Sequence, residues 1–276
     1  MRSRAWFLVV VLGATVVVRA TPAAPENPPH STVFYQSGGL RIEAYLYTPP
    51  GNGPFPLVIY NHGSRAGRER VEAPFPFVGR VLTNAGYAVL VPERRGYGQS
   101  GGQTFAEEVG NDKGVRFLAR QRAEAGDALA ALDYAATVPS LDRAHMAIMG
   151  WSFGGIVTVL AASQSSSFLA AVDQAGGSLS WNGSPTLQNA MRDAAGKIRI
   201  PVLCMVAEND ATTNAVKTVY EAAKPNNPAT ALIEYPAFTP TQNEANIAPG
   251  HLIFSAQGVR IWSKDVVSFL DANVRK

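Results

Sequence analysis

The chain has 276 residues, of which 46% are hydrophobic and 16% are charged. This composition excludes a disordered chain and is typical of a globular protein with a large core. The 24 basic and 21 acidic residues form no basic stripe with interleaved aromatic residues, so nucleic acid is excluded as an expected partner.

The first twenty residues have the layout of a secretory signal peptide. Two arginines precede an apolar run over 5–18, and Val-Arg-Ala at 18–20 supplies a small-residue cleavage site. The apolar run is shorter than the roughly 20 residues that a membrane span requires, although an uncleaved anchor is the alternative. We expect an exported protein, periplasmic or secreted, without stable membrane insertion after cleavage. Three of the basic residues would be lost with this segment, which leaves a formally neutral chain.

A proline-rich tether over 21–30 is expected before a single domain over 31–276. Two alternating runs, TVFYQ and LRIEAYLYTP, flank Gly38-Gly39 and predict a β-hairpin. The continuous apolar run LVIYNHG then predicts a strand buried on both faces.

Strand and helix patterns alternate through the rest of the chain. The predicted strands are YAVLVPE, HMAIMG, LAAVDQAG, PVLCMVAE and TALIEYP. The predicted helices are VGRVLTNAG, GVRFLARQRAEAGDALAALDYAATV, GGIVTVLAASQ, NAVKTVYEAAK and GVRIWSKDVVSFLDANV. This order predicts an α/β fold with a mostly parallel central sheet of about eight strands, an N-terminal antiparallel hairpin and helices on both faces. An irregular segment over 176–200 could form a small cap.

Catalytic groups in such a fold belong at the carboxyl ends of the strands. The stretch Gly150-Trp151-Ser152-Phe153-Gly154 lies between a predicted strand and a predicted helix. Glycines there permit a sharp turn that exposes the serine Oγ, and the following helix directs its first N–H groups at the site. We therefore predict that Ser152 is a nucleophile. The single cysteine, Cys204, lies in an apolar run and is expected in the core.

A serine nucleophile needs a base, and the chain has four histidines. His30 lies in the tether, and His145 opens a strand at the end that is far from the turn. His62 belongs to the loop after an earlier strand. His251 follows the nucleophile in chain order and lies in a loop between the last strand and the last helix, so it is the predicted base.

The imidazole in turn needs a carboxylate to hold its tautomer. Asp210, in VAENDATT just past a strand, is the favoured acid, with Glu208 in the same loop and Asp173 at the end of the preceding strand as alternatives. The predicted oxyanion donors are the backbone N–H groups of Phe153 and Ser64.

Several of these segments carry a resemblance to a known family. YNHGS, AGYAVLVPERRGYGQSGG, GWSFGG, VAEND and GHLIF come in the order found in α/β-hydrolases, within a span from residue 40 to the C-terminus. The chain resembles the dienelactone hydrolase-like and prolyl-oligopeptidase-like branch of serine hydrolases, which implies the α/β-hydrolase fold. In that family the loop matching PERRGYGQS organises a turn near the site. Glu93 stands here where Asp is commoner, and Ser152 stands where dienelactone hydrolase itself has a cysteine.

The expected function is cleavage of a small-molecule carboxylic ester through an acyl-enzyme, with no metal or organic cofactor. The alternatives are an amidase or small peptidase, and a non-catalytic binding protein on the same fold. Four aromatic residues could form the substrate pocket, although each could instead belong to the core: Trp151, Tyr97, Trp181 and Phe238. A cluster of arginines beyond the oxyanion loop could attract an acidic substrate or be a solvated loop: Arg65, Arg68 and Arg70.

Overall fold

The computed structural model describes residues 27–275. The predicted signal peptide and the first part of the predicted tether therefore lie outside the described residues. Just before the first strand, His30 packs edge-on against Tyr45, with the ring centroids 5.2 Å apart. None of the helices in the described part of the chain is long and apolar enough to cross a membrane.

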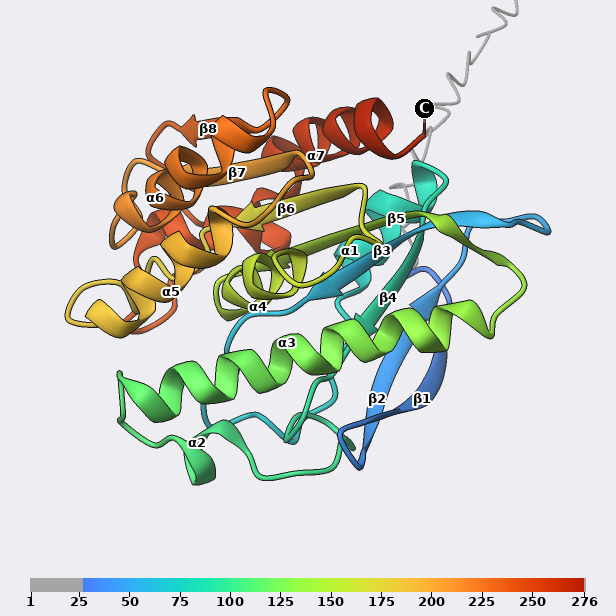
Figure 1. Ribbon diagram of the computed structural model, residues 1–276, viewed down its shortest axis with the longest axis horizontal. Helices are drawn as coiled ribbons and strands as arrows, with labels where there is room; N and C mark the ends of the chain where they lie inside the picture. Colours follow the sequence, from blue (N-terminus) through green and yellow to red (C-terminus); the bar gives the residue numbers. More distant parts are fainter. Residues whose placement is uncertain (1–26, 276) are drawn as a thin grey trace, which may run out of the picture.

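The strands of the described residues form one eight-stranded sheet. They are β1 (Ser31–Ser37), β2 (Leu40–Tyr47), β3 (Phe55–Asn61), β4 (Ala88–Pro92), β5 (Leu141–Trp151), β6 (Ala170–Gln174), β7 (Val202–Ala207) and β8 (Ala231–Tyr235). Their spatial order is β1-β2-β4-β3-β5-β6-β7-β8 (Figure 1). The pairs β1–β2 and β2–β4 are antiparallel, and the other pairs are parallel. The predicted mostly parallel sheet with an N-terminal hairpin is confirmed.

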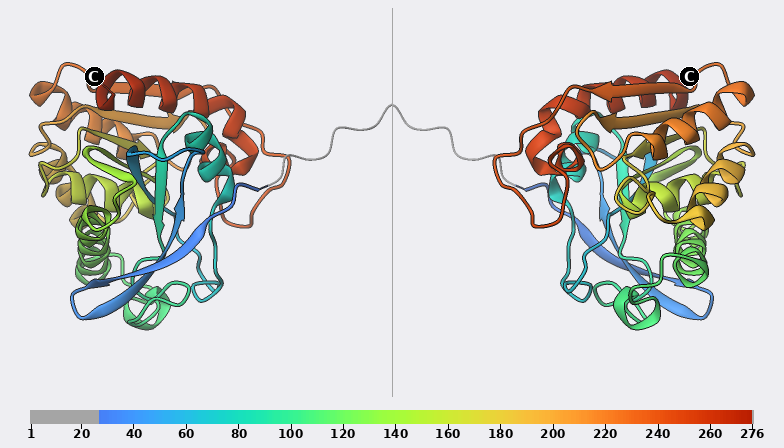
Figure 2. Two further views of the ribbon diagram at one scale, coloured as in Figure 1. Left: turned by 90° about the vertical axis from the view of Figure 1, so that its right-hand side faces the viewer. Right: turned by 90° about the vertical axis from the view of Figure 1, so that its left-hand side faces the viewer.

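Helices cover both faces of this sheet. They are α1 (Pro76–Asn84), α2 (Phe105–Glu108), α3 (Val115–Ala136), α4 (Phe153–Ala162), α5 (Pro185–Ala195), α6 (Asn214–Ala223) and α7 (Val259–Val274), with short 3-10 helices η1 (Lys224–Asn226), η2 (Pro249–Phe254) and η3 (Ala256–Gly258). One apolar core lies between the sheet and α3 to α6, and a second lies between the sheet and α1 with α7 (Figure 2).

The central strand β3 shows why its sequence is a continuous apolar run. Leu57 and Ile59 belong to the core beneath α3 and α4, whereas Val58 and Tyr60 belong to the core beneath α1 and α7. Because successive side chains of a strand point to opposite faces, a strand with two covered faces is apolar at every position.

The segment over 176–200, which the sequence pattern describes as irregular, contains a helix. It contains α5, which begins with Pro185 in its first turn and buries Leu187 and Met191 against the core. Proline suits the first position of a helix, since the missing N–H would have no helical partner there. Leu179, before this helix, stays partly exposed and belongs to a cavity described below.

The turn from β5 into α4 is packed too tightly for side chains at its glycines. A Cβ on Gly150 would lie 2.2 Å from the carbonyl oxygen of Gly154. A Cβ on Gly154 would lie only 1.8 Å from the carbonyl oxygen of Asn61, at the end of β3. The absence of these side chains is therefore what allows β3, β5 and α4 to meet.

Replacement of Gly154 by alanine should destabilise the fold, because the new methyl group overlaps backbone that cannot move aside. We expect the free energy of unfolding, measured by urea denaturation, to fall by about 3 kcal/mol. The matched control is Gly126→Ala in α3, where an added Cβ meets no atom within 4 Å. That variant should gain about 0.5–1 kcal/mol, since alanine favours a helix over glycine. A Gly154→Ala variant as stable as the parent chain would contradict the packing described.

Candidate active site

Ser152 occupies the turn between β5 and α4 in a strained conformation. Its φ of 60° and ψ of −119° lie outside the regions that non-glycine residues prefer. Its N–H donates to the Gln174 carbonyl at 2.9 Å, and its own carbonyl accepts from the N–H groups of Gly155 and Ile156. These bonds hold the serine at the N-terminus of α4, where the helix dipole favours negative charge.

His251 and Asp210 meet at the same edge of the sheet. The Nδ1 atom of His251 lies 2.9 Å and 3.1 Å from the two carboxylate oxygens of Asp210, and both side chains are almost wholly buried. Since a carboxylate only accepts, Nδ1 carries the proton and donates it. The Nε2 atom is buried and has no hydrogen-bond partner in the described part of the structure. Its lone pair is therefore available to accept the proton of a nucleophile.

Glu208, the alternative acid in the same loop, is placed differently. It is exposed to solvent, and its backbone N–H donates to the Tyr235 carbonyl at 2.9 Å. The carboxylate that contacts the imidazole is that of Asp210, whose Oδ1 also accepts from the N–H of Ala211 at 2.6 Å. The structure therefore brings Asp210, and not Glu208, to His251.

Close backbone contact joins the loop after β7 to the segment that carries His251. The N–H of Gly250 donates to the Asn209 carbonyl at 3.3 Å, and a Cβ on Gly250 would lie 2.5 Å from the backbone nitrogen of Asp210. The Asn209 side chain exchanges two hydrogen bonds of 2.9 Å with the backbone of Phe238, in the loop after β8. The loop after β7 is thus fastened at two points to the connection between β8 and α7, around Asp210 and His251.

The predicted oxyanion donors belong to segments next to the serine: Phe153 follows it in the chain, and Ser64 follows Gly63. Gly63, in the loop after β3, is so close that a Cβ on it would lie 3.2 Å from the Cβ of Ser152. Within the described residues, no hydrogen bond is made by the N–H of Ser64 or by the N–H of Phe153. Two unused donors beside a nucleophile can stabilise an oxyanion that forms on an attacked carbonyl group.

A cavity of about 420 Å³ opens onto these groups. Ser64, Ser152 and His251 contribute to its lining, together with five larger apolar residues: Phe75, Trp151, Leu179, Ile247 and Leu252. Of the aromatic residues predicted for the substrate pocket, Trp151 lies here, and its Nε1–H donates to the His251 carbonyl at 3.1 Å. The cavity can hold a small apolar substrate next to the serine.

The other three aromatic candidates do not line this cavity. Tyr97 is 1% exposed and packs edge-on against His62 with ring centroids 4.8 Å apart, and Trp181 belongs to the core beneath α3 to α6. Phe238 packs against the core beneath α7. Phe75, Leu179 and Ile247 line the cavity instead, and nothing in the sequence pattern singles them out, because they come from loops or helix ends without periodicity.

The arginine cluster beyond the oxyanion loop has mainly structural partners. Arg65 forms a two-pronged ion pair with the buried carboxylate of Glu93 and is only 11% exposed. Arg70 donates to two backbone carbonyls of the loop after β4, at 2.7 Å each. Arg68 is exposed at the edge of the cavity. Two of the three predicted anion-attracting residues therefore already hold the protein's own groups.

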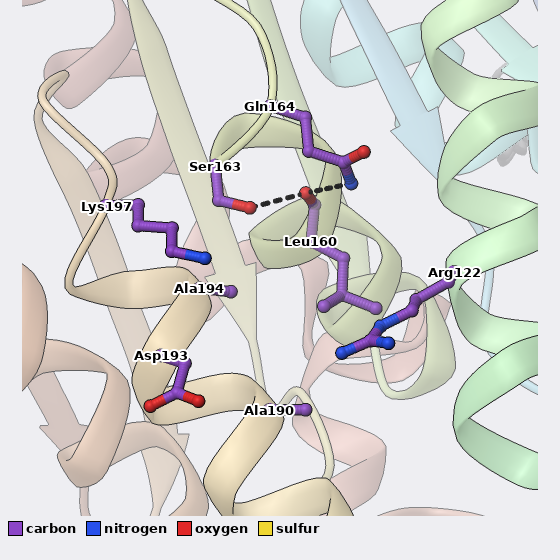
Figure 3. Close-up of a pocket in the computed structure, with 8 residues that line it drawn as sticks. All are labelled: Arg122, Leu160, Ser163, Gln164, Ala190, Asp193, Ala194 and Lys197. Carbon is purple, nitrogen blue, oxygen red and sulfur yellow. Dashed lines mark hydrogen bonds between the residues drawn. The ribbon is translucent and has the colours of Figure 1, made fainter. Parts of the chain in front are cut away.

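A second cavity, of about 260 Å³, lies at the opposite end of α4 (Figure 3). Ser163 lines it and donates to the Leu160 carbonyl at 2.8 Å, and Arg122 and Lys197 extend toward the same space. Ser163 lies eleven positions after Ser152, which corresponds to about 16 Å along the helix. No histidine is among the residues that line this second cavity.

Asp173, the other alternative acid, lies inside the core. Its Oδ1 accepts from the Gly176 N–H at 2.9 Å, and its buried Oδ2 has no partner among the described residues. Burial raises the pKa of Asp173 from 3.8 to about 7, and it raises the pKa of the neighbouring Cys204 thiol well above its ordinary value. A substantial fraction of the Asp173 carboxyl is therefore protonated in the folded protein at neutral pH, and the Cys204 thiol is protonated, because burial disfavours the charged form of each group.

Asp173→Asn should remove the contribution of this carboxyl group to the pH dependence of the unfolding free energy. A pKa raised by folding gives a stabilising contribution that is full below the unfolded value near 3.8 and is lost as the pH rises toward 7. Between pH 4 and pH 7 the parent chain should therefore lose about 3 kcal/mol of unfolding free energy relative to the variant. Urea denaturation at several pH values measures this difference. Asp193→Asn, at an exposed position, serves as control. If the difference in unfolding free energy between parent and variant were independent of pH for both variants, the assignment would be contradicted.

Comparison with known proteins places the chain among related sequences. It is 33% identical over 141 residues to the quorum-quenching protein AidA of Acinetobacter baumannii, covering 51% of this chain and 41% of that protein. It is 30% identical over 136 residues to the probable dipeptidyl-aminopeptidase B of Aspergillus clavatus, covering 46% of this chain and 14% of that protein. The chain thus spans less than half the length of these curated relatives.

A solved structure has the same fold. The esterase Pf2001 of Pyrococcus furiosus superposes with a TM-score of 0.62 at 17% identity, over 89% of this chain and 93% of that one. The model of the dienelactone hydrolase family matches residues 42–258, which is well over half of the chain. The protein is therefore a member of the dienelactone hydrolase family, with the α/β-hydrolase fold.

Proposed function

We propose that this protein is a serine hydrolase that cleaves carboxylic esters through an acyl-enzyme intermediate. The observation that carries the proposal is the Asp210–His251 contact, which leaves Nε2 of His251 without a partner among the described residues, on a residue that lines the same cavity as Ser152. A nucleophile, a base and an orienting carboxylate are the three groups that acyl transfer by a serine needs.

Ser152 attacks the ester carbonyl, and a bond forms between Oγ and the carbonyl carbon while Nε2 of His251 takes the hydroxyl proton. The carbonyl oxygen becomes an oxyanion, which the N–H groups of Phe153 and Ser64 stabilise. The C–O bond to the alcohol then breaks, and the imidazolium returns its proton to the departing oxygen. Water, activated by His251, releases the acid from Ser152 by the same steps.

Asp210 acts on this cycle through the imidazole. It holds the Nδ1–H tautomer and stabilises the imidazolium that forms during each attack. Its environment supports that role, because the carboxylate is buried with its oxygens on His251 and on one backbone N–H. A buried hydrogen-bonded carboxylate keeps a fixed orientation, which a solvent-exposed one does not.

Asp210→Asn should therefore reduce kcat by about 10³-fold or more, since the amide no longer enforces the tautomer or compensates the positive charge. The matched control is Glu208→Gln in the same exposed loop, which should retain kcat within about twofold, as expected of a surface substitution. Steady-state hydrolysis of a short p-nitrophenyl ester measures both variants. The reverse result, in which Glu208→Gln is impaired and Asp210→Asn is active, would contradict the assigned acid.

An amidase or small peptidase is the second candidate, because one curated relative is named a dipeptidyl-aminopeptidase. The same residues serve both reactions, but an amine leaves less readily than an alcohol and depends more on proton donation. Matched ester and anilide substrates with one acyl group separate the two candidates. We expect the ester to be cleaved at least about 10²-fold faster in kcat/KM, and comparable rates would favour the peptidase.

A further inference from the structure

The first two carbonyl groups of the loop after β3, those of His62 and Gly63, both accept hydrogen bonds. The Arg94 guanidinium donates through Nη2 to the carbonyl of His62 at 2.9 Å. The Nδ1 atom of His62 lies 2.7 Å from the carbonyl oxygen of the next residue, Gly63. Since a carbonyl oxygen only accepts, Nδ1 of His62 carries the proton of this bond.

The second of these bonds fixes the direction of a catalytic donor. The peptide between Gly63 and Ser64 is trans, so its carbonyl and its N–H lie in one plane and point in opposite directions. With the carbonyl held on the side of the His62 ring, the Ser64 N–H faces the other way. Gly63, Ser64 and Ser152 line the same cavity, and Gly63 lies against Ser152. The imidazole thus determines where the predicted oxyanion donor points.

His62 itself is held in one position and one charge state. It is fully buried, stacked on Phe75 with ring centroids 5.5 Å apart and planes 6° from parallel, and in edge contact with Tyr97. Burial and the neighbouring cations Arg94 and Arg65 hold the pKa of His62 well below its usual value, so the ring is neutral. A neutral imidazole has one N–H, and the bond to Gly63 requires it at Nδ1.

Arg94 is equally constrained. It is completely buried, has a positive φ of 43°, and directs Nε to the Glu124 carboxylate at 2.9 Å. The other oxygen of that carboxylate accepts from Nε of Arg120 at 2.8 Å. A strained backbone and a buried ion pair persist only where surrounding contacts enforce them. Together these contacts hold the Arg94 guanidinium where its Nη2 donates to the carbonyl of His62.

We propose that His62 and Arg94 are positioning residues for catalysis, which aim the Ser64 N–H at the oxyanion by holding the two preceding carbonyl groups. The inference rests on the proposed serine hydrolase function and extends it. Neither residue touches the substrate, so each should affect the transition state more than substrate binding. The effect should appear in kcat and leave KM almost unchanged.

The first test compares His62→Phe with His62→Asn. Phenylalanine keeps the ring that stacks on Phe75 and lacks the donor, whereas the asparagine amide can place an N–H near the former Nδ1 position. We expect His62→Phe to lower kcat by about 10- to 100-fold with KM within about twofold, and His62→Asn to recover at least about fivefold of that loss. Arg70→Met is the control, because Arg70 lies further along the same loop, donates to carbonyls of the loop after β4, and should leave kcat within about twofold.

A second readout needs no knowledge of the substrate. A fluorophosphonate probe phosphonylates an activated serine, and its P=O group occupies the oxyanion hole. Its second-order rate constant should fall in His62→Phe by the same factor as kcat. An unreactive parent enzyme would overturn the proposed function and this inference with it. Equal rates for a reactive parent enzyme and a folded His62→Phe would overturn this inference alone.

A third measurement uses the unmodified chain, so that a poorly folding variant does not decide the outcome. In ¹⁵N nuclear magnetic resonance at neutral pH, the His62 ring should show a protonated Nδ1 and an unprotonated Nε2. A proton on Nε2 instead would show that the bond to the Gly63 carbonyl is absent, and would overturn the proposal.

Discussion

Close backbone contact at glycines is the constraint on which the proposed active site depends. A Cβ on Gly154 would meet the Asn61 carbonyl, one on Gly155 would meet Asp173, and one on Gly250 would meet the backbone of Asp210. Each of these contacts joins a loop or turn of the site to its neighbour. Interiors of proteins are packed without room for an extra methyl group, so these positions accept no side chain without displacing a catalytic segment.

Buried charge beside the loop after β3 provides a second layer of organisation. Glu93 accepts from Arg65 and from the N–H of Ala73, which shapes the loop between β3 and α1. Glu124 forms ion pairs with both Arg94 and Arg120. Buried ion pairs contribute little net stability, because desolvation offsets their attraction. Their value here is geometric, since each charged group is hydrogen-bonded to a segment whose position determines the site.

The order of elements could be predicted from the sequence because alternating and continuous apolar runs have distinct periods. The candidate triad could be predicted because parallel strands bring their carboxyl ends to one edge, so that Asp210 and His251 were expected near Ser152. The structure brings Asp210 and His251 into contact. The sequence pattern does not predict helix α5. Its buried apolar positions distinguish it from a loop, but its polar positions do not.

The wall of the cavity was the least predictable part. Tyr97 and Trp181 are of the aromatic type that often lines pockets. Whether such a side chain lines a pocket or is buried in the core depends on tertiary packing, which a local sequence pattern does not contain. The contact between His62 and the Gly63 carbonyl is likewise invisible in sequence, because it depends on the ring's orientation between Phe75 and Tyr97. Sequence spacing predicted which loops meet, and the structure was needed to show which atoms of those loops face one another.

The central claim is that Ser152 is the activated nucleophile of this fold. Mass spectrometry of the protein after reaction with a fluorophosphonate tests it most directly, since the modified residue is identified from its peptide. The account predicts a single adduct, on Ser152, that is absent from the Ser152→Ala variant. An adduct on another residue, or an unmodified Ser152 in folded protein, would contradict it.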